Sequence, residues 1–422
     1  MNINQLLGTH TCSCGRTHSC DIEQVYIENG VINRLPELCA SYRSITLVGD
    51  NNTYPICGKE VEQVLSGKQL FVQIFEQEGV LVPNEAAVET LEKAAKNAEL
   101  IIGIGSGVIQ DLCKYVSFQK KIPYMIIATA PSMDGYASTG AAMIMDNMKI
   151  TYSAHVPMVI LAEPSVLAKA PEEMIAAGFG DIIGKYSCLN DWKLSHVVND
   201  EYFCQEIYDL TMSMVEKTIG LADGLLAKNE ESVKALMEAL VIVGIAMSYA
   251  GNSRPASGSE HHLSHFFEIT GILDNKPYFA HGIDVAYSAL ETQKIREEII
   301  KEGIPETLPF FERSAWEQGV KDIYTKAAEG VVSLQEKLGW HEEKRSYQKM
   351  EAEIIAVLRE APSSDYMEML LAKVGLNSER FEAMYGAEKI EHAVWYAKEL
   401  KDRYSVLWLY NEISPKCPYT KS

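Results

Sequence analysis

The feature that most constrains the fold is an alternation of short apolar, β-rich runs with helical patterns between about residues 44 and 165. A parallel connection between strands needs a crossover, which is usually a helix, so this alternation is typical of a parallel sheet. The sequence therefore predicts a Rossmann-like α/β domain. We expect strands at 44–50, 69–75, 99–105, 123–130 and 157–163, helices at 85–98 and 107–120, and a β excursion near residue 151.

The texture of the sequence changes after Pro164. Long helical patterns dominate from there, including 231–251, 349–361 and a segment near 205. A chain of 422 residues also exceeds what one hydrophobic core usually supports. We therefore predict an α/β dinucleotide-binding domain over 1–164 and an all-α-helical metal- and substrate-binding domain over 165–422, with the active site in the cleft between them.

Charge and apolar patterning exclude some classes of function. The 38 Lys and Arg residues against 58 Asp and Glu give a net charge of −20, which repels a nucleic-acid backbone, so no nucleic-acid partner is expected. No uninterrupted apolar run approaches the ~20 residues that cross a bilayer, and the first residues lack a signal pattern. These observations predict a cytoplasmic protein with no membrane partner.

The nine cysteines are odd in number and mostly scattered, which predicts reduced thiols in place of a disulfide framework. One group is closely spaced: Cys12, Cys14, His18 and Cys20. These residue types bind zinc, but the C-x-C-x3-H-x-C spacing is uncommon and no second cluster completes it. A hairpin turn without metal is the favoured interpretation.

A glycine-rich turn follows the third predicted strand, with Gly103, Gly105 and Gly107 leading into a helix. Glycines let backbone N–H groups approach a pyrophosphate, and a helix N-terminus favours its charge. The third glycine of the usual dinucleotide fingerprint is missing, so a plain strand-to-helix turn stays an alternative.

Two further loops extend the nucleotide hypothesis. Asp50 ends the first predicted strand and is suited to the ribose hydroxyls of NAD, although it is equally suited to initiating a turn. Thr129, Ser132, Asp134 and Ser138 follow a later strand, where loops of parallel sheets face the ligand. NAD(H) is therefore the expected cofactor, with NADP(H) as the alternative.

Histidine placement points to a metal. His261, His262 and His265 lie in one helical segment, and His281 follows within 21 positions. Two imidazoles and one carboxylate leave coordination positions open for substrate, as catalytic metal sites require. Asp181 is the best carboxylate candidate, with helix capping as its alternative role; the residues alone do not choose between His261 and His262.

Ordered segments of the chain resemble the sn-glycerol-1-phosphate dehydrogenase family, including its AraM-type members: GSGVIQD, TAPSMDGYAS, GFGDIIGK, SRPASGSEHHLSH and a later His-Gly. This family belongs to the iron-alcohol-dehydrogenase, glycerol-dehydrogenase and dehydroquinate-synthase superfamily. The resemblance spans about residues 40 to 285 and is weaker beyond. It implies a nucleotide domain followed by a helical domain, in a homodimer or higher homo-oligomer.

The resemblance also implies roles for individual residues. The metal ligands would be Asp181, His261 and His281, with Asp134, Asp181 and His265 facing the substrate. The nucleotide would contact a longer set: Gly105, Ser106, Gly107, Val108, Ile109, Gln110, Asp111, Thr129, Ala130, Pro131, Ser132 and Ser138. The family often has Glu after the last His-Gly, whereas this chain has Ile283 and Asp284.

The predicted reaction is the reversible reduction of dihydroxyacetone phosphate to sn-glycerol 1-phosphate by a metal-dependent NAD(P)H oxidoreductase. The metal, Zn²⁺ with Ni²⁺ or Fe²⁺ as alternatives, would polarise the ketone. His265 would relay the proton, or only donate a hydrogen bond to substrate. Lys185 and Arg254 would bind the phosphate of the small substrate, unless they form ion pairs.

Three other functions remain open at this point. A glycerol dehydrogenase would act on the unphosphorylated substrate, and a dehydroquinate-synthase-like cyclase or lyase would release phosphate without net NADH consumption. A catalytically silent binding protein is the remote alternative, which retention of all three metal ligands disfavours.

Overall fold

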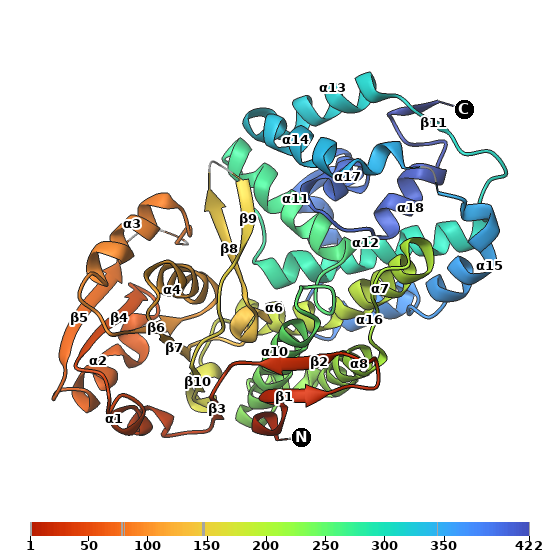
Figure 1. Ribbon diagram of the computed structural model, residues 1–422. Helices are drawn as coiled ribbons and strands as arrows, with labels where there is room; N and C mark the ends of the chain where they lie inside the picture. Colours follow the sequence, from red (N-terminus) through yellow and green to blue (C-terminus); the bar gives the residue numbers. More distant parts are fainter. Residues whose placement is uncertain (1, 77–78, 80, 146–147, 344, 422) are drawn as a thin grey trace. The chain divides into compact units, whose positions relative to one another are not determined.

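Figure 1 shows a computed structural model of the chain, which describes residues 2–76, 79, 81–145, 148–343 and 345–421. The chain forms two compact units. Unit 1 comprises Met1–Ile182 and Asp209–Ser253, and unit 2 comprises Ile183–Tyr208 and Arg254–Ser422. This division differs from the boundary predicted at residue 164. The reason is that helices α5 (Pro164–Leu167) and α10 (Glu230–Ala250) of the later region pack on each other, and α10 packs on elements of unit 1.

Unit 1 is built on a six-stranded sheet in which all neighbouring strands are parallel. The strand order is β3-β10-β7-β6-β4-β5. The strands are β3 (Gln24–Ile27), β4 (Ser44–Asp50), β5 (Gln69–Phe75), β6 (Leu100–Gly105), β7 (Tyr124–Ala128) and β10 (Val159–Ala162). The predicted parallel sheet is confirmed, and the edge strand β3 is an addition to it.

Helices cover both faces of this sheet. The helices of unit 1 and its junctions are α1 (Leu35–Leu38), α2 (Tyr54–Val64), α3 (Glu85–Ala94), α4 (Gly107–Lys120), α5 (Pro164–Leu167), α6 (Glu172–Ile183), α8 (Gln205–Ile219), α9 (Ala222–Leu226) and α10 (Glu230–Ala250). On one face, α2 buries Tyr54 and Val61 against strand residues such as Leu47 and Ile102. The predicted helices at 85–98 and 107–120 correspond to α3 and α4, which pack on each other.

Two hairpins complete unit 1. β8 (Gly140–Met145) pairs with β9 (Met148–Ser153), which is the β excursion expected near residue 151. β1 (Gly8–Thr11) pairs with β2 (Thr17–Cys20), and β2 packs on α10. Figure 1 shows both antiparallel ribbons.

Two helical glycines let α6 and α10 approach the loop that follows β7. A Cβ on Gly178 of α6 would lie 1.8 Å from the carbonyl oxygen of Pro131. A Cβ on Gly244 of α10 would lie 2.7 Å from the carbonyl oxygen of Asp134 and 2.8 Å from Cβ of Ala137. Only a residue without a side chain allows this proximity, so the glycines fix the position of the loop.

α10 is also, among the described residues, the one helix long and apolar enough to cross a membrane by length and composition. In its most apolar window 67% is buried inside the structure, as in a core helix of a globular protein. Its apolar character is therefore explained by packing within unit 1.

Unit 2 is almost entirely helical, which confirms the predicted helical character of the later part of the chain. Its elements are α7 (Lys185–Asn199), α11 (Ser259–Asp274), α12 (His281–Glu302), α13 (Arg313–Tyr324), α14 (Ala328–Leu338), α15 (Tyr347–Leu358), α16 (Ser364–Ala372), α17 (Ser378–Tyr396), α18 (Val406–Ile413) and a short ladder of β11 (Phe310–Phe311) with β12 (Thr420–Lys421). α11 and α12 pack on each other and on α7, which sets the frame for the histidines.

We predict that Gly244→Ala destabilises unit 1 by about 1–3 kcal/mol, the usual range for overpacking, because the new methyl group meets backbone atoms of the loop. Gly220→Ala is the control, since its Cβ would meet the nearest atom, the carbonyl oxygen of Lys217, at an ordinary 3.5 Å. Urea denaturation of the two variants measures the difference. Equal midpoints for Gly244→Ala and the wild type would contradict the close-approach argument.

Candidate functional site

The glycine turn of unit 1 has the geometry of an anion-binding helix start. Gly105 ends β6, and α4 begins at Gly107 after Ser106. A Cβ on Gly105 would lie 2.6 Å from Cβ of Ile109, so glycine is what lets the first turn of α4 pack this tightly against the strand. The first backbone N–H groups of a helix have no partner within it and favour a phosphate.

Two buried side chains of α4 fasten the loop after β7. The Gln110 amide donates to the hydroxyl of Tyr124 at 3.1 Å and to the carbonyl of Tyr136 at 2.9 Å. The Lys114 ammonium donates to the carbonyls of Gly135 and Gly140 at 2.9 and 2.8 Å. Gln110, predicted from the family to contact the nucleotide, is fully buried and supports the loop with its side chain.

Lys114 was not anticipated from the sequence. It also donates to the Ser138 hydroxyl at 3.3 Å and lies 3.5 Å from a carboxylate oxygen of Asp111. Burial lowers the pKa of Lys114, and the Asp111 carboxylate opposes that shift. Two of the predicted nucleotide residues, Asp111 and Ser138, are therefore linked through one cation.

Asp50 lies at the carboxyl end of β4, as predicted. One oxygen of its carboxylate accepts the N–H groups of Asn52 at 2.9 Å and Thr53 at 2.7 Å. This is the turn-initiating role that the sequence left open. The ribose contact stays a prediction.

Asp181 and Asp134 are joined within unit 1. The backbone N–H of Asp134 donates to Oδ2 of Asp181 at 2.8 Å, and the Asp181 side chain is fully buried in the last turn of α6. A carboxylate held by a backbone N–H on one oxygen keeps a fixed orientation for its other oxygen. The chain passes into unit 2 at Ile183, two residues after Asp181.

Three histidines gather in unit 2. His261 and His265 lie one turn apart on α11, and His281 is the first residue of α12. The ring centroids are separated by 5.0 Å for His261 and His281, 5.6 Å for His265 and His281, and 6.0 Å for His261 and His265. Ring nitrogens of His261 and His281 lie within 4.8 Å of each other, a spacing that one metal ion can bridge.

Glu260 fixes the orientation of His261. Nδ1 of His261 lies 2.6 Å from Oε1 of the buried Glu260. A carboxylate accepts, so Nδ1 carries the proton and Nε2 keeps the lone pair that binds a metal. Burial raises the pKa of Glu260, while the Gly258 N–H and the Lys185 ammonium oppose the shift.

The structure distinguishes the environment of His262 from that of His261. His262 is fully buried, and among the described residues neither of its ring nitrogens has a hydrogen-bond partner. Burial lowers the pKa of His262 well below its usual value, with the cationic Arg403 as the next cause. A neutral core histidine fits these facts.

The residues after His281 include Asp284, one of the two positions at which the sequence departs from the family pattern. Asp284 lies buried in the first turn of α12, and its oxygens accept the Tyr385 hydroxyl at 2.8 and 3.0 Å. The Tyr385 oxygen in turn accepts the N–H of Phe279 at 3.1 Å. Nδ1 of His281 lies 3.4 Å from the Ser264 hydroxyl. Asp284 therefore anchors the segment before His281.

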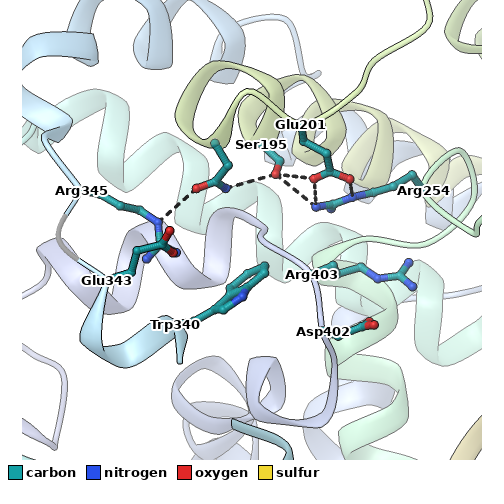
Figure 2. Close-up of a pocket in the computed structure, with 9 residues that line it drawn as sticks. Ser195, Glu201, Arg254, Trp340, Glu343, Arg345, Asp402 and Arg403 are labelled. Atoms are coloured by element: carbon teal, nitrogen blue, oxygen red, sulfur yellow. Dashed lines mark hydrogen bonds and ion pairs between the residues drawn. The ribbon is translucent and has the colours of Figure 1, made fainter. Parts of the chain in front are cut away.

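The two predicted phosphate-binding residues are both engaged within unit 2. The Lys185 ammonium is buried and donates to the carbonyl of Ala256 at 3.0 Å. Arg254 is paired with Glu201 and donates to the carbonyl of Tyr404 at 2.6 Å. Arg254 also lines a pocket of about 340 Å³. Figure 2 shows this pocket, whose other lining residues are Ser195, Asn199, Glu201, Trp340, Glu343, Arg345, Asp402 and Arg403. Arg254 therefore forms an ion pair, the alternative role that the sequence analysis left open for it. Its binding of the substrate phosphate stays a prediction.

Comparison with known proteins identifies the family. Residues 26–171 match the model of the iron-containing alcohol dehydrogenase family. Glycerol-1-phosphate dehydrogenase [NAD(P)+] of Halalkalibacterium halodurans is 31% identical over 409 residues, covering 95% of each chain. The chain belongs to the glycerol-1-phosphate dehydrogenase family.

Further relatives agree with this assignment. The glycerol-1-phosphate dehydrogenase of Geobacillus stearothermophilus is 29% identical, covering 95% of this chain and 96% of its own. The iron-containing alcohol dehydrogenase of Thermococcus thioreducens has the same fold, with a TM-score of 0.62 at 12% identity, covering 93% of this chain and 98% of its own.

In this member of the glycerol-1-phosphate dehydrogenase family, one buried carboxylate positions the start of α11. Asp191 accepts the N–H of Ser259 at 2.6 Å, the N–H of Val406 at 3.0 Å and a guanidinium N–H of Arg296 at 2.7 Å. Asp191 and Arg296 are both fully buried. These contacts join α7, α11, α12 and α18. The contact with α11 is at Ser259, two residues before His261.

Sequence reasoning missed Glu260, Asp191, Arg296 and Lys114. Glu260 had a local signal, since a carboxylate directly before a ligand candidate can reach its second nitrogen. Asp191 and Arg296 are 105 positions apart, and no spacing rule pairs them. Lys114 resembles an ordinary lysine of an amphipathic helix.

We predict that Asp191→Ala lowers the free energy of unfolding of unit 2 by roughly 3–5 kcal/mol, because it leaves Arg296 as a buried unpaired charge. Glu291→Ala on the same helix as Arg296 is the control. Its partner Lys294 is half exposed, so the loss should stay below about 1 kcal/mol. Urea unfolding followed by tryptophan fluorescence measures both, and similar losses would count against the role of Asp191.

Proposed function

We propose that the protein catalyses the NAD(P)H-dependent reduction of dihydroxyacetone phosphate to sn-glycerol 1-phosphate and the reverse reaction. The observation that carries the proposal is the pair His261 and His281, with His261 oriented by Glu260, in a chain of the glycerol-1-phosphate dehydrogenase family. An imidazole whose second nitrogen is held by a carboxylate is the usual form of a metal-binding histidine. These donors fit a divalent metal.

The ligands we assign to this metal are Asp181, His261 and His281. Asp181 supplies a carboxylate whose Oδ2 is already held by the N–H of Asp134. One carboxylate and two imidazoles suit Zn²⁺, which we propose, as well as Ni²⁺ and Fe²⁺. When bound, such an ion supplies Lewis-acid chemistry at the carbonyl oxygen of the substrate.

The remaining steps fall to the chain itself. His265, whose ring centroid lies within 6.0 Å of those of His261 and His281, would give a proton to the substrate oxygen that becomes the secondary hydroxyl. Asp134 would orient the substrate hydroxyls. Lys185 would face the phosphate if its bond to Ala256 is exchanged for one to substrate.

The nucleotide would bind in unit 1, with its pyrophosphate at the start of α4. The narrow turn at Gly105 and the loop secured by Gln110 and Lys114 would form the walls. We propose NAD(H) as the preferred form, since Asp50 would repel a 2′-phosphate. We also propose a cytoplasmic homodimer or higher homo-oligomer, as the family resemblance implies.

We predict that the reconstituted protein oxidises NADH with dihydroxyacetone phosphate at a kcat/KM roughly 100-fold or more above that with dihydroxyacetone. The reason is that two hydrogen bonds from charged donors to a phosphate contribute about 1.5–3 kcal/mol each. A chelator should abolish the reaction, and Zn²⁺, Ni²⁺ or Fe²⁺ should restore it. Equal efficiencies would indicate a glycerol dehydrogenase, and phosphate release without net NADH consumption would indicate a cyclase.

We predict that Glu260→Gln weakens binding of the catalytic metal by about 10–100-fold, because a neutral amide holds the His261 tautomer less firmly. His261→Ala should lose the ion altogether. Glu268→Gln, two turns later on α11, is the control and should bind metal like the wild type. Competition against a chromogenic chelator gives the affinities. Wild-type affinity in Glu260→Gln would remove Glu260 from the site.

A further inference from the structure

The N-terminal hairpin holds a second group of metal-binding side chains, separate from the proposed catalytic residues. Cys12, Cys14 and His18 lie in and beside the turn between β1 and β2, and their ligand atoms are within 4.8 Å of one another. Cys12 and His18 are buried, with exposed fractions of 7% and 4%. We propose that these three residues form a structural zinc site.

The turn is shaped to bring the two sulfurs together. The N–H of Cys12 donates to the carbonyl of Arg16 at 3.2 Å, and the N–H of Gly15 donates to the carbonyl of Cys12 at 3.1 Å. Gly15 has a φ of +83°, a conformation that side chains rarely adopt. The N–H of Cys14 points at Sγ of Cys12, 3.4 Å away. A backbone donor of this kind stabilises a thiolate.

The orientation of His18 selects the nitrogen that would bind the ion. Its Nδ1 lies 2.8 Å from the carbonyl oxygen of Tyr249, and its ring stacks on the Tyr249 ring at 5.6 Å. A carbonyl only accepts, so Nδ1 carries the proton and Nε2 keeps its lone pair. Nε2 faces Sγ of Cys14. A metal-binding histidine has this arrangement, with the other N–H donated to a carbonyl.

The distance between these two ligand atoms agrees with zinc geometry. Zn–S bonds of about 2.3 Å and Zn–N bonds of about 2.0–2.1 Å at tetrahedral angles place sulfur and nitrogen roughly 3.5–3.6 Å apart. Sγ of Cys14 and Nε2 of His18 are 3.5 Å apart. A single thiol hydrogen bond explains that distance but not the presence of a second sulfur, that of Cys12, within 4.8 Å of both atoms.

The site binds metal without any redox step. Each thiol loses one proton when it ligates, so two protons leave as the ion binds. Three protein ligands occupy three corners of a tetrahedron, and water or another thiolate takes the fourth. Cys20 is not in the group, although the sequence counted it as a candidate; it is a buried thiol of β2.

A zinc ion in the hairpin would stabilise the contact between the hairpin and α10. The hairpin is fastened to α10 through Tyr249, which holds His18 and also donates its hydroxyl to the carbonyl of Leu6. One position earlier, Ser248 donates to the carbonyl of Ala137 at 2.9 Å, in the loop after β7. A metal in the hairpin would therefore stabilise the end of α10 that holds this loop.

Cobalt substitution tests the site in the reduced full-length protein. Thiolate ligands give Co²⁺ a near-ultraviolet charge-transfer band, and the proposed catalytic donors contain no sulfur. The band should appear in the wild type and in His261→Ala. It should vanish in Cys12→Ser and Cys14→Ser, and Cys20→Ser on the same hairpin should keep it. Zinc content should fall by one ion per chain in Cys14→Ser.

Folding of the serine variants is checked by far-ultraviolet circular dichroism and by NADH turnover. Amide exchange gives a second measurement that needs no variant. With zinc at about 100 times its dissociation constant, exchange of the amides of 8–20 in the wild type should slow by roughly 100-fold relative to the metal-free protein. A wild type without the thiolate band, a band that persists in Cys14→Ser, or unchanged exchange would overturn the proposal.

Discussion

The helices that carry the histidines depend on one buried ion pair. Asp191 binds Arg296 of α12, the first N–H of α11 and the first N–H of α18. A buried pair of this kind adds little net stability, because desolvation offsets the attraction, but its geometry is demanding. Gly258 shows how demanding: a Cβ there would lie 2.6 Å from Oδ2 of Asp191. The start of α11 is therefore fixed in position, and with it the direction of His261.

Unit 1 positions the loop after β7 by close approach of helix backbones together with one buried cation. The loop after β7 is held by Lys114 from one side, while Gly178 and Gly244 let α6 and α10 contact its backbone from others. The same loop supplies the N–H that holds Asp181. A change in the packing of α10 is thus transmitted to the carboxylate proposed to bind the metal, since loop and carboxylate are joined by a hydrogen bond.

The sequence predicted what depends on local pattern. The strands 44–50 and 69–75 have the predicted bounds, because each is a β-rich apolar run of the kind that predicts a strand. The edge strand β3 was missed, since its four residues alternate exposed and buried positions and carry no long apolar run. The histidine cluster was found from spacing, whereas Arg254 could not be assigned to Glu201, which is 53 positions away. Partners distant in the chain leave no periodic signal.

His261, His18 and His262 differ in the partner of their ring nitrogen Nδ1. An acceptor at Nδ1 keeps the proton there and leaves the lone pair of Nε2 for a metal. His261 has Nδ1 on the Glu260 carboxylate, and His18 has Nδ1 on the Tyr249 carbonyl, so both keep Nε2 as a lone-pair donor. His262 has no such acceptor among the described residues and is a neutral core residue. The sequence shows three histidines of one chemical type, and the acceptor behind the ring distinguishes the two that we propose as metal ligands from the core residue His262.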